Sequence, residues 1–459
     1  MAAACCLECA RRDSEGGCSI GAGVSGRDRG AVTEGNSEIV EDRRGWRLVL
    51  VGTLVSSIGS GLTLPFLVVY LHSIRHMSLP LAGVVVAVSG VTGLATGAIG
   101  GSLGDRLGVG RLLFGGLLIS GAATVGLADA RTPLVAAVAV ALIGVGESVI
   151  WPALNALVAS QLSSPNRPRA YALRFGVLNG GLGLGALIAG SVVSLSRPTS
   201  FEVIYVVDGL TTIAFAFIVG VGLRHRPGFR THPAVGDEQE MAGDGYRVVL
   251  RDRRFLAWLV ASAMFVLFGY AMLDGGWAAY ATVIVHASPR IVGIGFAVNT
   301  GVIVVAQLGV AHLTRRWRRS RMLAAVGVLW SLAWLMAGIA DVHGLAHLEV
   351  DIALALSLGV FGLGETLLSP VAGALPNDLA PKHLRARYNA LGSTVWSLGT
   401  IAGPPIAGLL LASSFPLSWI GLLVLGSAGA GLVGLNLGRL LPTAIDRPLA
   451  PDEQSEPSS

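Results

Sequence analysis

The chain has 459 residues, of which 53% are hydrophobic and only 13% are charged. Because soluble globular proteins carry roughly 25% charged residues, this composition excludes an ordinary soluble domain and indicates a membrane protein. The formal net charge of +5 does not indicate a nucleic-acid-binding protein, since the basic residues form short clusters between apolar segments rather than one patch.

Residues 1–45 form a polar N-terminal tail that contains all four cysteines of the chain, Cys5, Cys6, Cys9 and Cys18. No disulfide framework can therefore support the rest of the fold. The tail also lacks the apolar region of a signal peptide. We expect a disordered cytoplasmic tail.

Twelve apolar segments follow, and each is long enough to cross the hydrocarbon core, which takes about 20 helical residues. They cover residues 48–72, 80–101, 111–130, 133–160, 171–196, 201–223, 255–285, 289–313, 321–341, 350–376, 386–412 and 416–441. The sequence therefore predicts an all-α membrane protein with twelve transmembrane helices.

The longest polar interruption divides these segments six and six. We expect a six-helix bundle at residues 46–223, a central cytoplasmic loop at 224–254, a second six-helix bundle at 255–441 and a cytoplasmic C-terminal tail at 442–459.

The distribution of basic residues predicts the orientation. If the N-terminus is cytoplasmic, only Arg75, Arg131, Arg197 and Arg290 lie on the outer side, and the other 29 of the 33 basic residues lie in the tails, the cytoplasmic loops or the adjacent helix ends. Positive residues favour the cytoplasmic side. The sequence thus predicts a multi-pass protein of the cell (plasma) membrane with both termini in the cytoplasm.

The first half of the chain recurs in the second half at an offset of 218 residues. The matching pairs include Gly144/Gly362, Gly146/Gly364, Glu147/Glu365, Pro152/Pro370, Gly181/Gly399 and Gly185/Gly403. Since each half has an even number of spans, the two halves share one orientation. Parallel repeats of this kind are described for one large class of secondary transporters.

The segment GGSLGDRLGVGR, residues 100–111, resembles the signature loop of the major facilitator superfamily, glycine-x-leucine-x-aspartate-arginine-x-glycine followed by basic residues. The matching residues are Gly101, Leu103, Asp105, Arg106 and Gly108, with Arg111 as the following basic residue. With the span count and the repeat, the resemblance covers residues 46–441 and implies the major facilitator fold. It also implies that this loop latches the cytoplasmic side in one conformation; a charged loop that only sets topology is the alternative.

Two glycine-rich stretches, GGLGLGALIAG and GTIAGPPIAG, lie within the fifth and eleventh predicted spans. Small residues inside a span favour close helix packing, and the stretches follow no strand as a nucleotide-binding turn would. The expected packing and hinge positions are Gly181, Gly185, Gly399, Gly403 and Pro404. The stretches also resemble the span-five motif of drug:proton antiporters, although only the second one keeps the proline.

Three carboxylates, Glu147, Asp274 and Glu365, lie near the middle of the fourth, seventh and tenth predicted spans. An ionisable side chain at the bilayer centre costs about 2.5–3.5 kcal/mol on insertion scales, which makes each one a functional candidate. Removal from water disfavours the ionised form of an acid, so such a group can carry a proton. The resemblance implies that these spans line a central cavity. The alternative is that each acid only bonds a neighbouring helix.

Aromatic residues accompany these acids. Tyr270, Asp274 and Trp277 have the i, i+4, i+7 spacing that places residues on one face of an α-helix. An acid between two aromatic rings suits an amphipathic cation. A similar stripe on the fourth span consists of Glu147, Trp151 and Asn155.

Pro152 and Pro370 each follow a glutamate by five residues. A proline inside a helix removes one backbone hydrogen bond and favours a bend. We expect hinge positions there, beside the two acids.

These features predict a secondary active transporter that works by alternating access, and the antiporter resemblance implies proton-coupled efflux of small amphipathic or drug-like compounds. A proton symporter or facilitator that imports a nutrient, and a non-transporting receptor or scaffold, are the alternatives. The expected partners are a small-molecule substrate, protons and the lipid bilayer, with no nucleic acid, and the expected state is a monomer. We expect no cofactor, no metal and no enzyme activity, since the sequence has no GxxxxGK[ST] phosphate loop and its spans hold no metal-ligand cluster.

Overall fold

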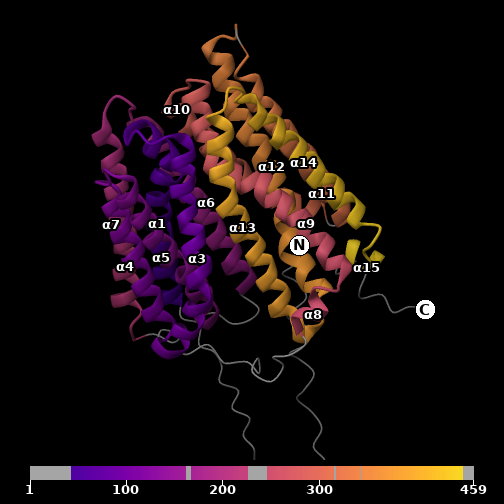
Figure 1. Cartoon of the computed structure of the whole chain (residues 1–459). Coiled ribbons are helices and arrows are strands. Elements are labelled where there is room, and N and C mark those ends of the chain that lie inside the picture. The colour runs from indigo at the N-terminus through magenta and orange to yellow at the C-terminus, as the bar shows by residue number, and fades with distance from the viewer. Residues whose placement is uncertain (1–42, 162–166, 226–244, 315–316, 343, 448–459) are drawn as a thin grey trace, which may run out of the picture. The chain divides into compact units, whose positions relative to one another are not determined.

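A computed structural model of the chain describes residues 43–161, 167–225, 245–314, 317–342 and 344–447, which belong to one compact unit. Twelve helices in this part of the chain are long and apolar enough to cross a membrane, and the described residues contain no strand. The prediction of an all-α protein with twelve spans is confirmed (Figure 1).

The first six spans begin with α1 (Arg43–Thr63), which continues through η1 (Leu64–Phe66), α2 (Leu67–Val69) and η2 (Tyr70–Ile74). The other five are α3 (Leu79–Leu107), α4 (Val109–Leu127), α5 (Pro133–Gln161), α6 (Arg167–Val192) and α7 (Pro198–Gly222). We call the end of the bundle where α1 begins the Arg43 end, and the opposite end the Ile74 end.

The second six spans begin with α9 (Arg253–Phe265), which continues through η5 (Val266–Tyr270), η6 (Leu273–Trp277) and η7 (Tyr280–Ile284). The others are α10 (Pro289–Leu313), α11 (Arg319–Ile339), α12 (His347–Leu379), α13 (Arg385–Leu411) and α14 (Leu417–Leu437). The short helices α8 (Gly245–Val249), η8 (Lys382–Leu384) and α15 (Thr443–Asp446) lie between or after the spans.

Three segments differ from the expectation. Helix α8 lies in the expected central loop, and α15 in the expected C-terminal tail, where buried Asp446 accepts hydrogen bonds from the backbone and hydroxyl of Ser320. The expected loop at 100–111 is helical as far as Leu107. The turn between α3 and α4 is one residue, Gly108, whose φ of 84° is in the left-handed region that favours glycine.

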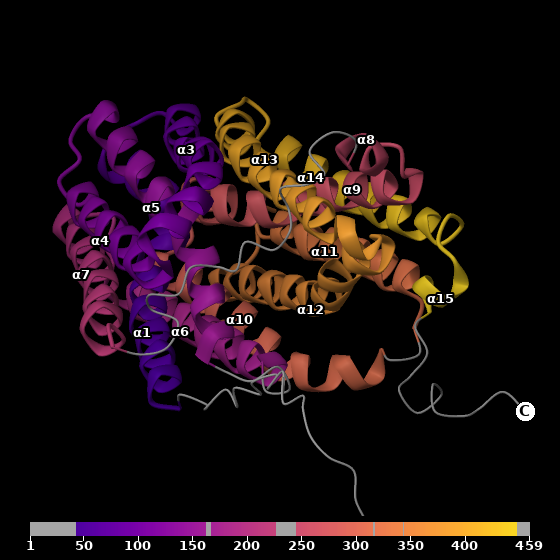
Figure 2. The ribbon, with the colours of Figure 1, turned by 90° about the horizontal axis from the view of Figure 1, so that it is seen from below.

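Two helix pairs connect the first half of the chain to the second, α3 with α13 and α6 with α10 (Figures 1 and 2). Near the Ile74 end the backbones touch directly. A Cβ atom on Gly83 of α3 would lie 2.2 Å from the carbonyl oxygen of Pro404, and one on Gly408 of α13 would lie 2.3 Å from that of Leu79. Side chains at these positions would force the halves apart, so the glycines permit closure of the Ile74 end.

The internal repeat is visible in the backbone. Residues Tyr70–Ile74 and Tyr280–Ile284 both form π-helical turns, 210 positions apart. Each turn is followed by a histidine with positive φ, 55° at His76 and 57° at His286. The two repeats therefore end their first span in the same way.

The offset grows to 218 positions at the pair Glu147 and Glu365. Helix α5 begins at Pro133, 14 residues before its glutamate, whereas α12 begins at His347, 18 residues before its own. The second repeat thus has eight more residues than the first between these two points. Half of them lengthen the start of α12, and the other half lie before α12, at the Ile74 end.

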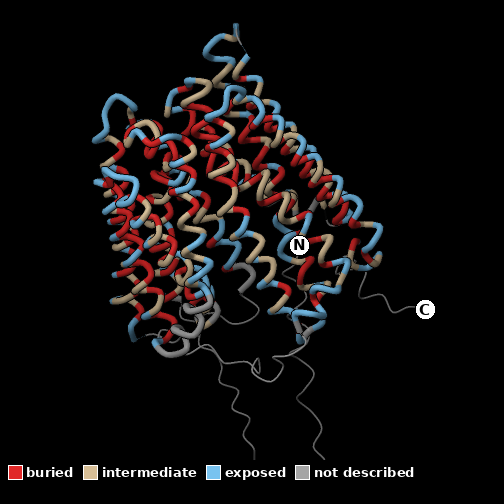
Figure 3. The backbone as a smooth tube through the Cα atoms, in the orientation of Figure 1, coloured by how far each residue is buried: buried red, intermediate tan, exposed pale blue. Residues whose placement is uncertain are grey.

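Many residues along the helices are exposed, as the pale blue segments in Figure 3 show, and a large share of them are bulky and apolar. Leu134, Val328 and Leu425, for example, are 75%, 68% and 74% exposed. In a protein without a membrane such surfaces would aggregate, and here they suit contact with lipid.

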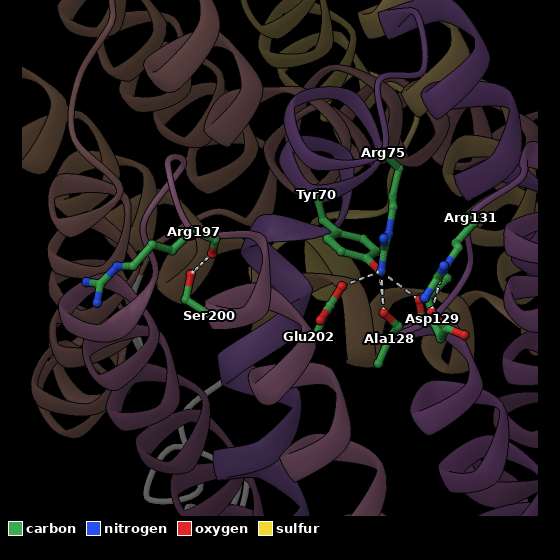
Figure 4. A network of polar contacts seen from close by, with 9 residues as sticks. Tyr70, Arg75, Ala128, Asp129, Arg131, Arg197, Ser200 and Glu202 are labelled. Carbon is green, nitrogen blue, oxygen red and sulfur yellow. Dashed lines mark hydrogen bonds and ion pairs between the residues drawn. The ribbon is translucent and has the colours of Figure 1, made fainter.

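A polar network fastens the Ile74 end of the first half (Figure 4). The guanidinium of Arg75 donates to the hydroxyl of Tyr70 at 2.7 Å, to Glu202 at 3.0 Å and to the backbone carbonyl of Ala128. Since these partners belong to η2, to α7 and to the end of α4, one arginine connects three elements.

Candidate substrate and proton-coupling site

The larger described cavity has a volume of about 510 Å³ and lies between the two halves. We call it the main cavity. Its lining includes Phe175, Leu178 and Asn179 of α6, Trp258 and Phe265 of α9, Tyr270 of η5, Gln307 of α10, Glu365 and Pro370 of α12, and Trp396 of α13. Tyr270 lies near the middle of its span, and the other residues lie in the parts of their helices nearer the Arg43 end. The cavity is therefore displaced toward the Arg43 end, away from the glycine contacts.

A smaller cavity of about 120 Å³ adjoins the main cavity. Asn179, Tyr270, Ile303 and Glu365 line both. The small cavity is also lined by Asp274 from η6 and by residues of η1 and α6 from the first half. Two of the three predicted carboxylates thus meet where the halves of the chain face each other.

The two carboxylates have different surroundings. Glu365 accepts a 2.7 Å hydrogen bond from the side-chain amide of Asn299 on α10, and this amide also donates to the backbone carbonyl of Leu358. Asp274 lines the small cavity and has no hydrogen bond to any residue in the described ranges. One acid is held by a neighbouring helix, and the other is available to a solute.

Aromatic rings form much of the wall beside Glu365. The ring of Tyr270 lies 4.9 Å from that of Trp396 and 5.3 Å from that of Trp330, measured between ring centres. Trp330 in turn stacks on Phe361 at 4.4 Å. This contact network fixes the orientation of Tyr270.

The structure places Trp277 away from both cavities. Its side chain is fully buried, packs edge-on against Phe296 and lines neither described cavity. The reason is the backbone: η5 and η6 are π-helical, so the i, i+4, i+7 rule of an α-helix does not hold between Tyr270 and Trp277. Trp396 of α13, which the sequence did not single out, is the aromatic partner of Tyr270 in the cavity.

The third carboxylate belongs to a separate cluster. Glu147 accepts a 3.0 Å hydrogen bond from the indole of Trp151, and both side chains are exposed. Neither residue, nor Asn155, lines the main or the small cavity. The predicted stripe on α5 is therefore present, but it lies away from the cavities that Asp274 and Glu365 line.

The sequence reading missed Arg174 of α6, which joins this stripe. Its Nη1 donates a 2.7 Å hydrogen bond to Oδ1 of Asn155, and its guanidinium carbon lies 5.4 Å from the ring centre of Trp151. In the sequence, Arg174 is one of the basic residues near the start of a predicted span. Its position seven residues inside α6 was the signal that could have identified it.

The predicted packing positions lie at helix crossings. Gly181 and Gly185 contact α1, Gly399 and Gly403 contact the continuous run from α9 to η6, and Pro404 contacts α3. Helices α5 and α12 continue past their prolines, Pro152 and Pro370, to Gln161 and Leu379.

The latch residues are only partly described. Gly101, Asp105 and Arg106 belong to the last turns of α3, and their side chains lie outside the described part of the chain. Arg111 is exposed in the first turn of α4.

Comparisons with known proteins agree with this architecture. The family profile described as Major Facilitator Superfamily matches residues 49–285 and 262–458. The uncharacterized MFS-type transporter YttB of Bacillus subtilis (strain 168) is 23% identical over 377 residues, which cover 80% of this chain and 88% of the relative. The multidrug resistance protein MdtH of Yersinia enterocolitica is 24% identical over 346 residues, which cover 74% of this chain and 80% of the relative.

Solved structures share the fold. The peptide transporter POT in complex with sulfate has a TM-score of 0.67 at 19% identity, covering 88% of this chain and 95% of that chain. A mutant of the nucleoside transporter NupG has a TM-score of 0.67 at 12% identity, and the match covers 87% of this chain and 100% of that chain. At these identities the likeness concerns the fold alone.

Proposed function

The chain belongs to the major facilitator superfamily, and from this premise we propose that it is a secondary active transporter that exports small amphipathic or drug-like compounds in exchange for protons. The observation that carries the proposal is the meeting of Glu365 and Asp274 with Tyr270 and Asn299 in adjoining cavities between the two halves.

The arrangement of contacts and cavities supports alternating access. The halves touch through backbone near the Ile74 end, and the main cavity lies toward the Arg43 end. We take the Arg43 end as cytoplasmic, in line with the distribution of arginines. The conformation is then one that faces the cytoplasm, with residues 46–223 and 255–441 as the two moving bundles, and Asp105 and Arg106 in a latch that acts on this side.

Proton coupling rests on the carboxylates. Water-poor surroundings favour a neutral acid, and a bound cation or a hydrated cavity favours its ionised form. Glu365 and Asp274 line cavities between the halves, which makes them better placed than Glu147 to exchange a proton for a substrate. Glu147 is proposed as an additional acid in the first half.

The cavity wall supports the substrate class. Ligand sites are commonly about 300–1,000 Å³ with mostly apolar linings and a few polar groups. The main cavity, at about 510 Å³, combines Tyr270, Trp396 and Phe175 with one carboxylate, Glu365. Aromatic faces attract amphipathic and cationic groups. The multidrug resistance proteins among the relatives agree with this substrate class.

The protein is proposed to act as a monomer in the plasma membrane with both termini in the cytoplasm.

The test is transport in proteoliposomes with an imposed proton gradient and a panel of cationic, neutral and anionic aromatic compounds. We expect movement of a substrate to be accompanied by proton movement in the opposite direction, and Glu365→Gln and Asp274→Asn to uncouple the two. Ser357→Ala is the control, since its buried hydroxyl bonds only its own helix and the residue lines neither cavity. Proton movement in the same direction as the substrate would show symport instead, and wild-type coupling in both acid variants would reject the assignment of the acids.

A further inference from the structure

Arg174 is a buried cation inside a membrane span. Its side chain belongs to a residue that is 6% exposed. Its Nη1 donates to Asn155, whereas its Nε has no hydrogen-bond partner. No carboxylate within the described ranges pairs with it. An arginine is rarely buried without a counter-charge, because the loss of hydration is then uncompensated.

Two other arginines of the described chain with little exposure, Arg75 and Arg319, show what is missing. Arg75 pairs with Glu202 at 3.0 Å, and Arg319 pairs with Asp378 at 2.6 Å. Both pairs lie at the ends of spans, where they connect neighbouring elements. Arg174 has an amide and an aromatic ring in place of a carboxylate, so its positive charge is available to an anion from outside the chain.

Arg174 does not line the main cavity itself, but it is adjacent to residues of α6 that do. Phe175, the next residue, and Leu178, one turn further along α6, both line that cavity. On the α5 side, Trp151 is 44% exposed and Asn155 is exposed. The guanidinium thus lies beneath an accessible edge formed by the two α5 side chains.

We propose that Arg174, Trp151 and Asn155 form an anion-binding subsite beside the main cavity, which takes the oxyanion (a carboxylate, sulfonate or phosphate ester) of a substrate with an aromatic or aliphatic body. The proposal rests on the proposed transport function. A guanidinium offers several N–H donors in one plane, which match the two oxygens of such a group. The ring of Trp151 holds the guanidinium by cation–π contact, and its exposed edge can contact the apolar part of the ligand.

The subsite belongs to the first half alone. At the repeat offset of 218, the positions of Trp151, Asn155 and Arg174 are occupied by Ser369, Gly373 and Gly392. The acids of the cavities, Asp274 and Glu365, belong to the second half. The first half thus contributes the cation Arg174, with the carboxylate of Glu147 bonded to Trp151 beside it, and the second half contributes the two cavity acids. We infer that the substrates include compounds that carry an anionic group, alone or together with a cationic one.

The experiment uses three probes with the same aromatic body, which carries an ammonium group, no charge or a carboxylate. Uptake and equilibrium binding of each probe are measured for purified wild-type protein and for the variants Arg174→Gln and Arg174→Lys, in vesicles of phosphatidylcholine alone. Arg290→Gln is the charge-matched control, because Arg290 is exposed at the Ile74 end.

We expect Arg174→Gln to raise the KM and the Kd of the carboxylate probe by about tenfold or more, the size expected for a lost charge-assisted hydrogen bond. The ammonium probe should keep its wild-type values, which also shows that the variant is folded. For the carboxylate probe, the KM and Kd of Arg174→Lys should lie between those of the wild type and of Arg174→Gln, since lysine keeps the charge without the planar donors. Arg290→Gln should have the wild-type values.

Equal effects of Arg174→Gln on the ammonium and carboxylate probes would overturn the proposal, as would an unchanged Kd for the carboxylate probe. A second set of vesicles contains anionic phosphatidylglycerol. An effect of Arg174→Gln that appears only there and is independent of probe charge would assign the arginine to a lipid headgroup and overturn the substrate subsite. If the carboxylate probe binds in an Arg174-dependent way and no probe is transported, the subsite stands and the transport function falls.

Discussion

The side-chain amide of Asn299 donates a 2.7 Å hydrogen bond to Glu365 and so joins α10 to α12 where the main and small cavities meet. Asn299 is buried, with 5% of its surface exposed, so the orientation of the carboxylate is fixed by a group that itself cannot move freely. A coupling acid that must face a solute in a defined way requires such support.

Replacement of Asn299 by leucine should therefore slow transport while Glu365 remains in place. The loss of one hydrogen bond to a buried charged group costs about 1.5–3 kcal/mol, and the carboxylate is left free to rotate. We expect a lower ratio of protons to substrate moved, measured with a pH-sensitive dye inside the vesicles. Ser357→Ala on α12 serves as the control, since its hydroxyl bonds only its own helix and the residue lines neither cavity. A wild-type ratio in Asn299→Leu would show that Glu365 needs no such support.

Trp396→Ala should weaken substrate binding without changing the maximal rate. Trp396 lies 4.9 Å from Tyr270 in the wall of the main cavity, and an aromatic contact contributes roughly 0.5–1.5 kcal/mol. We expect the KM of an aromatic cation to rise about fivefold at an unchanged kcat. Trp317→Ala, at an exposed tryptophan outside both cavities, is the matched control. Equal KM values in the two variants would remove Trp396 from the site.

Trp277→Ala should have the reverse pattern of effects. Trp277 is fully buried against Phe296, and removal of a buried aromatic side chain typically costs about 3–5 kcal/mol of folding stability. We expect a clearly lower Tm in detergent and, for the protein that remains folded, a wild-type KM. A raised KM at an unchanged Tm would return Trp277 to the substrate site.

The features of this protein that can be predicted from its sequence are those that depend on one segment alone and not on contacts with other helices. The twelve spans are local, because apolar length alone decides whether a segment can cross a bilayer. The acids at Glu147, Asp274 and Glu365 are local as well, since a charge within a span is visible without any knowledge of neighbouring helices. Two of these acids do line the cavities between the halves.

What the sequence could not predict depends on contacts between helices or on the exact backbone. The π-helical turns before Trp277 change the number of residues per turn, and no simple pattern of residues announces them. The burial of Arg174 results from its contact with Asn155 and Trp151 on another helix. A basic residue seven positions inside a span looks, in the sequence, like any arginine near a membrane surface.

Gly83→Val should open the Ile74 end. A Cβ atom at Gly83 would lie 2.2 Å from the carbonyl oxygen of Pro404, so α3 and α13 must separate. Because a two-state protein responds to a clash in one state by populating the other, we expect a larger fraction of outward-facing molecules. The measurement is the labelling rate of a cysteine placed at Leu64, in the small cavity, with an impermeant maleimide added from the Ile74 side.

The control for this experiment is Gly97→Val on the same helix, where a Cβ atom would have nothing within 4 Å. A labelling rate in Gly83→Val no faster than in Gly97→Val would mean that the contact with Pro404 does not hold the Ile74 end closed.

Arg75→Gln should destabilise the first half of the chain. The arginine side chain is 11% exposed and pairs with Glu202, and its loss leaves that acid and the carbonyl of Ala128 without their donor. We expect a loss of about 1–3 kcal/mol, seen as a lower Tm. Arg131→Gln removes a solvent-exposed pair with Asp129 in the same region and should leave the Tm close to that of the wild type. Equal Tm values would make the Arg75 network dispensable.

The eight additional residues before Glu365 distinguish the second repeat from the first at the Ile74 end of α12. A chain that has already gained length there is a good candidate to tolerate an inserted epitope just before His347, and antibody binding to intact cells would then show which side of the membrane this end faces. The same extension has a use in image reconstruction. Two similar bundles related by a pseudo-twofold axis are easily interchanged when single particles are aligned, and an antibody fragment bound at this extension would mark one bundle and remove the ambiguity.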